Sequence, residues 1–315
     1  MSVFEKILLA SDGSECAGLA AQMAAEISGK LGSELHLASA APLPVIYGPE
    51  AYVPSPDDME MLNVHAEREA RSTVEAEEER LREMGVKVSG VHPSVGRADE
   101  QIVDLAESLP ASLIVVGSRG LGRLKRVLLG SVSESVLRHA HCPVLVVRGR
   151  HGEGDFFPTR ILLAADGSKE SAAAARTAAG LAKETGSELY LVHVIPALPP
   201  QPYPYYSLES QEERLERTKK EVRKFLDGRA EQLESEFGSR PRTHLRVGDP
   251  RKEIVELSDE IDAGLVVLGS RGYDGLSRVL IGSVSEGVVR HARCPVLVVR
   301  DGKLAEEAGF EENTG

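Results

Sequence analysis

The chain has 315 residues, of which 42% are hydrophobic and only 4% aromatic, so packed cores must be built from Leu, Val, Ile and Ala. At about 100–200 residues per domain, this length predicts about two domains. The net charge of -12 disfavours non-specific binding to nucleic acid, although a short loop can still present backbone N–H groups to a small anion.

Short apolar runs alternate with helical patterns in the first half of the chain. The predicted strands are 3–10, 35–40, 86–91, 113–116 and 144–147, and the predicted helices are 14–30, 56–84, 99–108 and 131–140. The second half repeats this order, with strands at 161–165, 189–194, 244–247, 265–268 and 296–299. Such alternation predicts an α/β protein whose parallel sheets are doubly wound, with helices covering both faces.

An internal repeat defines the domains. Lys6–Glu15 reads KILLASDGSE and Arg160–Lys169 reads RILLAADGSK. Further along, Gly117–Arg148 and Gly269–Arg300 match at 24 of 32 positions without a gap. We therefore predict two tandem five-stranded domains, 1–149 and 160–300, with a linker at 150–159 and a flexible acidic tail at 301–315.

The sequence shows no sign of secretion or membrane insertion. The N-terminus lacks the basic segment and long apolar run of a signal peptide, and no stretch reaches about 18 apolar residues. The three cysteines are too sparse for a disulfide framework or a zinc cluster. We expect reduced thiols, a cytoplasmic location and no membrane partner.

Two segments that both halves of the chain share lie directly after predicted strands. Ligands bind at the carboxyl ends of strands in doubly wound sheets. Asp12 and Asp166 follow the first strand of each half. The motif G-x2-G-x9-G-S follows the fourth strand and comprises Gly117, Gly120, Gly130 and Ser131 in the first half, and Gly269, Gly272, Gly282 and Ser283 in the second. Glycine permits positive φ and close backbone approach, and a helix N-terminus favours an anion. The pattern predicts a phosphate cradle in each half.

A purely structural interpretation of these residues stays open. The glycine motif also suits a turn that leaves a strand and caps a helix. Asp-Gly-Ser before an Ala-rich helix is a good capping sequence, so Asp12 and Asp166 are equally suited to a cap or to contact with ribose hydroxyls or an adenine amine. The H-x-x-C pairs at His139 and His291 are expected to be structural, because histidine suits a helix C-terminus.

The glycine motif, the D-G-S segment and the final C-P-V-L-V-V strand resemble the ATP-binding subgroup of the universal stress protein family. The resemblance covers nearly the whole chain, twice. It implies an adenine nucleotide alpha hydrolase-like, Rossmann-like fold, with the two lobes arranged as an internal pseudo-dimer. It also implies that ATP is the ligand of each lobe, that Asp12 and Asp166 contact adenine or ribose, and that the glycine motif contacts ribose and phosphates.

The same resemblance extends the predicted site beyond these motifs. Val132 and Ser133, and Val284 and Ser285, are expected beside the phosphates. Ala10 and Ala40, and Ala164 and Val194, are expected to line the adenine slot. The first loop carries four basic residues, Arg119, Arg123, Lys125 and Arg126, whereas the second carries Arg271 and Arg278. One hypothesis is that lobe one binds phosphates more tightly, and the alternative is that these are solvated loop charges.

These features favour an ATP-binding regulatory protein of the stress response with little or no turnover, because neither a P-loop nor a general base is visible. A slow ATPase or a nucleotidyl- or phosphoryl-transfer enzyme is the first alternative, and a nucleotide-free scaffold is the second. Mg²⁺ bridging the phosphates is compatible with the site, although its ligands are not visible. The sequence does not decide whether two chains pair as a homodimer.

Overall fold

The computed structural model describes residues 3–43, 55–120, 129–149, 158–197, 211–271 and 281–300. The chain divides into two compact units, Met1–Phe157 and Pro158–Gly315, which we call lobe one and lobe two. Residues 150–157 of the predicted linker and the whole predicted tail lie outside the described residues. Among the described residues, no helix combines the length and the apolar character needed to cross a bilayer.

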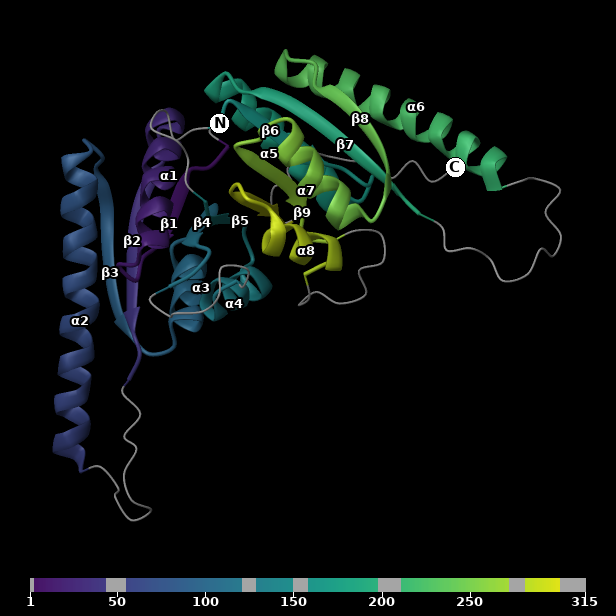
Figure 1. The fold of residues 1–315 in the computed structure, drawn as a ribbon. Helices are drawn as coiled ribbons and strands as arrows, with labels where there is room; N and C mark the ends of the chain where they lie inside the picture. The colour runs from purple at the N-terminus through teal and green to yellow at the C-terminus, as the bar shows by residue number, and fades with distance from the viewer. Residues whose placement is uncertain are drawn as a thin grey trace. The chain divides into compact units, whose positions relative to one another are not determined.

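Each lobe alternates strands and helices as expected (Figure 1). Lobe one contains β1 (Lys6–Ala10), α1 (Glu15–Leu31), β2 (Glu34–Ala41), α2 (Pro56–Glu83), β3 (Val88–Val95), α3 (Ala98–Ser108), β4 (Leu113–Gly117), α4 (Ser131–His139) and β5 (Val144–Val147). Lobe two contains β6 (Arg160–Ala164), α5 (Lys169–Thr185), β7 (Glu188–Pro196), α6 (Gln211–Phe237), β8 (Arg242–Gly248), α7 (Pro250–Glu260), β9 (Leu265–Gly269), α8 (Ser283–His291) and β10 (Val296–Val299).

The strand order confirms a doubly wound parallel sheet in each lobe. In lobe one the order is β3-β2-β1-β4-β5, and in lobe two the order is β8-β7-β6-β9-β10. The chain therefore moves outward from β1 in one direction, through β2 and β3, and then in the other, through β4 and β5. The order reverses between β1 and β4, which is the place where ligands bind in such sheets.

The strand register brings several strand ends to the same level. Ala10, at the end of β1, pairs with Ala38 of β2 on one side and with Val116 of β4 on the other, all in parallel. The central strands are buried on both faces: Leu8 and Leu9, which point to opposite faces of β1, have no exposed surface. Helices on both faces explain why β1 is a continuous apolar run rather than an alternating one.

One predicted strand differs clearly from the structure. β3 was expected at 86–91 but covers Val88–Val95, so that it includes Pro93, which pairs with Ser39 of β2. Proline lacks the N–H of a ladder hydrogen bond and is tolerated on edge strands. Because β3 lies at the end of the strand order in lobe one, Pro93 does not interrupt the sheet.

Candidate functional site

A pocket of about 290 Å³ opens in lobe one where the strand order reverses. The ends of β1, β2 and β4 form its floor, and the first turns of α3 and α4 form its rim. All of the residues predicted for the lobe-one site line this pocket, namely Ala10, Asp12, Ala40, Gly117, Arg119, Gly120, Gly130, Ser131, Val132 and Ser133. The structure thus brings together segments that lie more than a hundred residues apart in the chain.

Other lining residues were not predicted from the sequence. They are Ser11, Ala17, Ala38, Ser39, Ala98, Ile102, Val116 and Leu129. Ala38 could have been found, since it lies two residues before Ala40 and therefore on the same face of β2. Ala98 and Ile102 belong to α3, which carries no motif, and only the crossover from β3 to β4 places that helix at the pocket.

Asp12 lies in the turn between β1 and α1. Its Oδ1 accepts a hydrogen bond from the backbone N–H of Ser14 at 3.0 Å. The Ser14 hydroxyl caps α1 by accepting from the Ala17 N–H, and it also lies 3.3 Å from the carbonyl oxygen of Arg119, to which it donates. Ser14 is therefore the helix cap, while Asp12 faces Gly120 of the loop after β4, where a Cβ would collide with the Asp12 carboxylate.

The glycines of the motif permit close packing rather than positive φ. None of the described motif glycines is among the residues with positive φ. A Cβ at Gly117 would lie 2.7 Å from the carbonyl carbon of Cys16 in α1, and a Cβ at Gly130 would lie 3.4 Å from the Ser118 carbonyl oxygen. The close approach of β4 to α1 therefore explains Gly117, whereas a Cβ at Gly130 would make only ordinary contacts with the loop after β4.

The N-terminus of α4 faces the pocket without a side-chain cap. Gly130 is the N-cap residue and offers no side chain, so it makes no side-chain capping bond to the first N–H groups of α4. Ser131 and Val132 are exposed at the pocket. The Ser133 hydroxyl instead donates to the Gly117 carbonyl oxygen at 2.6 Å, so it holds β4 against α4. Uncapped N–H groups and the helix dipole both favour an anion here.

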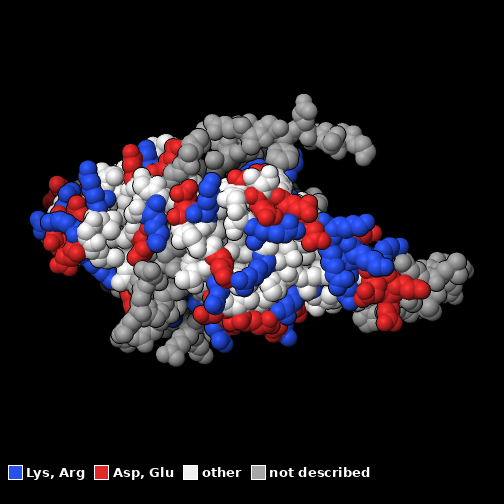
Figure 2. All heavy atoms as spheres, turned by 90° about the horizontal axis from the view of Figure 1, so that it is seen from above, with Lys and Arg blue, Asp and Glu red and all other residues white. Residues whose placement is uncertain are grey.

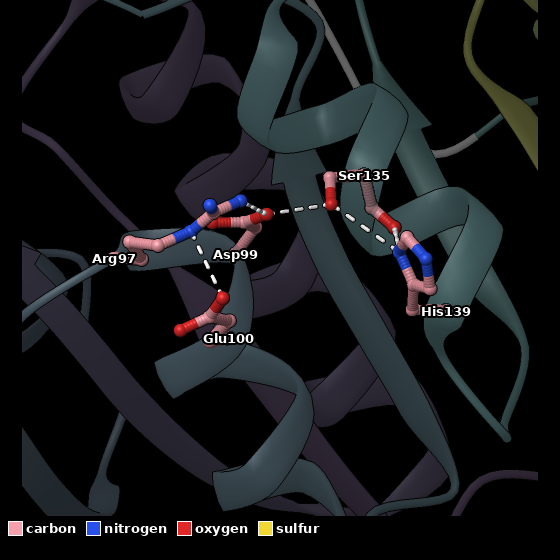
Figure 3. A network of polar contacts seen from close by, with 5 residues as sticks. All are labelled: Arg97, Asp99, Glu100, Ser135 and His139. Carbon is pink, nitrogen blue, oxygen red and sulfur yellow. Dashed lines mark hydrogen bonds and ion pairs between the residues drawn. The ribbon is translucent and has the colours of Figure 1, made fainter.

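A polar network beside the pocket joins the first turn of α3 to α4 (Figure 3). Arg97 pairs with Asp99 at 3.0 Å and with Glu100 at 3.0 Å, and the Ser135 hydroxyl donates to Asp99 at 2.6 Å. The hydrogen bonds from Arg97 and Ser135 lower the pKa of Asp99 to about 2. His139 Nδ1 lies 2.8 Å from the Ser135 carbonyl oxygen. The Ser135 hydroxyl also lies 3.3 Å from His139 Nδ1, but it donates directly to Asp99, so the contacts do not follow the order of a Ser-His-Asp nucleophile.

Lobe two repeats the central contacts. Ser168 caps α5, its N–H donates to Asp166 Oδ1 at 2.9 Å, and Ser285 donates to the Gly269 carbonyl oxygen at 2.7 Å. The remaining predicted residues there occupy the equivalent strand ends and helix start, namely Ala164 of β6, Val194 of β7, and Gly282, Ser283 and Val284 at the start of α8. Arg271 pairs with Glu170 at 3.8 Å, an interaction that has no counterpart at Cys16 of lobe one.

Parts of both loops lie outside the described residues. These parts are 121–128 and 272–280, and they include Gly272, Arg123, Lys125, Arg126 and Arg278. The hypothesis that lobe one binds phosphates more tightly through its basic loop therefore stays a prediction. On the face shown in Figure 2, acidic and basic side chains lie close to one another among uncharged ones.

Comparison with known proteins places this geometry in a family. The family model described as the universal stress protein family matches residues 4–148 and 158–300. A universal stress protein of Mycobacterium bovis is 29% identical over 310 residues, covering 93% of this chain and 94% of the relative. One from Mycobacterium tuberculosis is 34% identical over 205 residues, and the match spans only 64% of each chain.

A single-domain relative and a solved structure agree with this. A universal stress protein of Methanocaldococcus jannaschii is 35% identical over 154 residues, covering 49% of this chain and 88% of the relative. The crystal structure of a universal stress protein from Archaeoglobus fulgidus has a TM-score of 0.68 at 24% identity and covers 96% of this chain and 98% of that chain, a likeness that shows the fold. With the family model matched once in each lobe, the chain belongs to the universal stress protein family as two tandem copies of its domain.

Proposed function

We propose that this protein binds ATP at the switch point of each lobe and acts as a stress-response regulator with little or no turnover. The observation that carries the proposal is the lobe-one pocket, where the uncapped start of α4, the tightly packed glycines and Asp12 meet around one cavity. Backbone N–H groups at a helix N-terminus are suited to phosphate oxygens.

The pocket residues fit the three parts of a nucleotide. The small apolar side chains of Ala10, Ala38 and Ala40 leave a slot between strand ends that suits a planar base. The exposed Asp12 carboxylate lies beside that slot, where it would face ribose hydroxyls. The phosphates then lie along Gly120 and the first turn of α4. A volume of about 290 Å³ is at the lower end for small-molecule sites, which suits a nucleoside with its phosphates toward the open rim.

The lining favours binding over hydrolysis. Among the described lining residues, the ionisable side chains are Asp12 and Arg119. Asp12 lies beside Gly120 and the α1 start, where it suits the ribose, so it is poorly placed to activate a water at the terminal phosphate. Mg²⁺ would be held chiefly by the phosphates, because the described residues contain no group of three or more His, Cys, Asp or Glu side chains that could bind a metal.

Titration calorimetry of the full chain with ATP, ADP and AMP tests the binding proposal. We expect saturable ATP binding with two sites per chain. Gly120→Ala should weaken one of these sites by about tenfold to a hundredfold, because the new Cβ displaces the Asp12 carboxylate from its position. The matched control is Gly29→Ala in α1, where a Cβ meets nothing within 4 Å.

Two results would contradict the proposal. Absence of ATP binding by the wild-type chain would leave a nucleotide-free scaffold, and equal binding by Gly120→Ala and Gly29→Ala would move the site elsewhere. Incubation with labelled ATP tests turnover separately. We expect product formation at the background rate, whereas hydrolysis that disappears in the Asp12→Asn and Asp166→Asn variants would favour the enzyme alternative.

A further inference from the structure

A buried carboxylate lies behind the lobe-one pocket. Glu77 of α2 is only 5% exposed, and its Oε2 accepts a hydrogen bond from the Ser11 hydroxyl at 3.1 Å. Ser11 is itself 4% exposed and lines the pocket, directly after β1 and before Asp12. A chain of contacts therefore runs from the pocket wall through Ser11 to a helix that does not line the pocket.

Ser11 links this carboxylate to the turn that carries Asp12. Because its proton points to Glu77, the Ser11 oxygen is free to accept the backbone N–H of Gly13, at 3.3 Å. Gly13 has φ of +74°, a conformation that glycine adopts without strain. Thr73, one turn before Glu77 on α2, lies against the other side of Gly13, with its Cγ2 3.7 Å from where a Cβ would be. One face of α2 thus supports the turn.

This arrangement is expensive for folding alone. Burial of a carboxylate is unfavourable unless the charge is well paired. Glu77 Oε1 is buried without a hydrogen bond, and its ion partner Arg80 lies 3.7 Å away. A leucine at position 77, like the buried Leu81 on the same helix, would fill the space at a lower cost in folding free energy. A buried carboxylate oxygen that has an ion partner but no hydrogen bond calls for an explanation other than packing.

Lobe two lacks this carboxylate and holds its turn differently. Ala165 stands where lobe one has Ser11. Alignment of the buried Leu81 of α2 with the buried Leu233 of α6 places Arg229 at the position of Glu77. There the Asp166 N–H donates to the Ser171 hydroxyl at 3.2 Å, and His193 Nδ1 lies 2.8 Å from the Ala165 carbonyl oxygen. The Ser11–Glu77 contact is therefore specific to lobe one. Lobe two serves as an internal control in experiments that alter this contact.

We propose that Glu77 is a positioning residue of the lobe-one nucleotide site, which acts through Ser11 to fix the turn that presents Asp12. The ligand named here rests on the proposed function, whereas the control of the turn by Glu77 does not. Glu77 accepts the Ser11 proton, Ser11 accepts the Gly13 N–H, and the Asp12 carboxylate is held toward Gly120 before the ligand arrives. Preorganisation of this kind lowers the ordering cost of binding.

Hydrogen exchange on the full chain tests this inference, because peptides from each lobe report separately. Glu77→Leu should exchange the Gly13 amide faster than wild type in the absence of nucleotide. Protection of the lobe-one peptides from exchange should require about threefold to tenfold more ATP than in wild type, which is the effect of losing one hydrogen bond. Protection of the lobe-two peptides should be unchanged. The melting temperature should be unchanged or slightly lower, because relief from burying the carboxylate is offset by the buried Ser11 hydroxyl, which loses its acceptor.

Four further variants decide how Glu77 acts. Ser11→Ala should reproduce both exchange effects, and the double variant should show no additional loss, because the two residues form one path. Glu77→Gln keeps an acceptor for Ser11 and should restore most of the lobe-one affinity. Glu75→Gln, an exposed carboxylate on the same helix, should behave as wild type.

The inference is overturned if Gly13 exchanges at the wild-type rate in both Glu77→Leu and Ser11→Ala, or if the two changes add. If Glu77→Leu fails to fold, Ser11→Ala alone decides the outcome. A wild-type chain that gains no protection from ATP in either lobe refutes the proposed function, yet faster Gly13 exchange in the variants would still support control of the turn by Glu77.

Discussion

At the scale of single residues, the two lobes form equivalent ion pairs in which the acidic and basic residues have exchanged positions. Arg97 pairs with Asp99 at the start of α3, while the equivalent positions at the start of α7 are Asp249 and Arg251, which pair at 2.8 Å. The neighbouring position on the following helix changes with them. Ser135 donates to Asp99, whereas Gly287 leaves room for the Arg251 side chain, which packs where a Cβ would be. The residues on the two helices change together, because the carboxylate needs a hydrogen-bond donor beside it and the guanidinium side chain needs space.

The lowered pKa of Asp99 makes a pH-dependent contribution to stability. Its folded pKa of about 2 lies below the value of about 3.9 for an unfolded chain, so the contribution is complete above pH 4 and is lost as pH falls toward 2. Asp99→Asn should therefore reduce the free energy of unfolding by about 1 kcal/mol at pH 7, a value discounted because Arg97 is largely exposed. Urea unfolding at pH 7, 4 and 2.5 measures this.

Comparison of the variant with wild type isolates Asp99 from the other carboxylates. The difference between the two should shrink as pH falls from 4 to 2.5, since wild-type Asp99 becomes protonated. Asp104→Asn, an exposed change on the same helix, serves as the control. A difference that stays constant over this range would show that Asp99 does not titrate there.

At the scale of the helix, the equivalent helices α3 and α7 differ in how their N-termini are capped. The N-cap of α3 is Arg97, which makes no side-chain capping bond, whereas the N-cap of α7 is Asp249, whose carboxylate accepts the Arg251 N–H. The following residue is Ala98 in α3 and Pro250 in α7. The two N-cap backbones are nearly identical, with φ and ψ of -71° and 117° at Arg97 and -74° and 116° at Asp249.

Because the backbone already suits proline, Ala98→Pro should stabilise lobe one. The first helical N–H has no helical acceptor, and proline restricts the unfolded chain, so we expect a gain of about 0.4–1 kcal/mol in the free energy of unfolding. Equilibrium urea unfolding measures the change. Val103→Pro, in the interior of α3, is the contrasting variant and should cost about 3 kcal/mol. A loss of stability in Ala98→Pro would mean that the two helix starts are less alike than their dihedral angles.

At the scale of the whole molecule, the charge opposes the proposed ligand while the local geometry favours it. The chain carries a net charge of -12, with acidic and basic side chains in small groups on the face in Figure 2. Long-range attraction therefore contributes little to capture of a polyphosphate. Affinity must come from backbone N–H groups and close contact within the pocket, which are less sensitive to salt than exposed charges.

Ligand binding to the folded state should appear as increased thermal stability. At a free ATP concentration of 100 times Kd, each occupied site should add about 2.7 kcal/mol to the stability of its lobe. Differential scanning calorimetry at fixed Mg²⁺ and ionic strength measures the rise in melting temperature. Sodium tripolyphosphate is the control, because it offers phosphates without the base and ribose, and it should stabilise less. Equal stabilisation by both would argue against a contribution from the alanine-lined slot.

Local patterns in the sequence determined much of this protein. The repeat established two domains, the alternation of apolar runs and helical patterns established the α/β class, and the motifs after the first and fourth strands identified Asp12, Gly117 and Gly130. These features can be predicted from the sequence because the patterns that mark strands, helices and strand ends involve residues close together in the chain. The family likeness rested on the same short segments.

Only the tertiary structure decided which distant residues meet and why. It placed Ile102 of α3 at the pocket, continued β3 through Pro93 at a sheet edge, and set Glu77 against Ser11 across 66 residues of chain. It also showed that the described motif glycines lack positive φ and that Gly117 and Gly120 lie where a Cβ would collide with neighbouring atoms. Such contacts depend on crossover connections and side-chain packing between elements, and neither quantity is written in the local pattern of any one element.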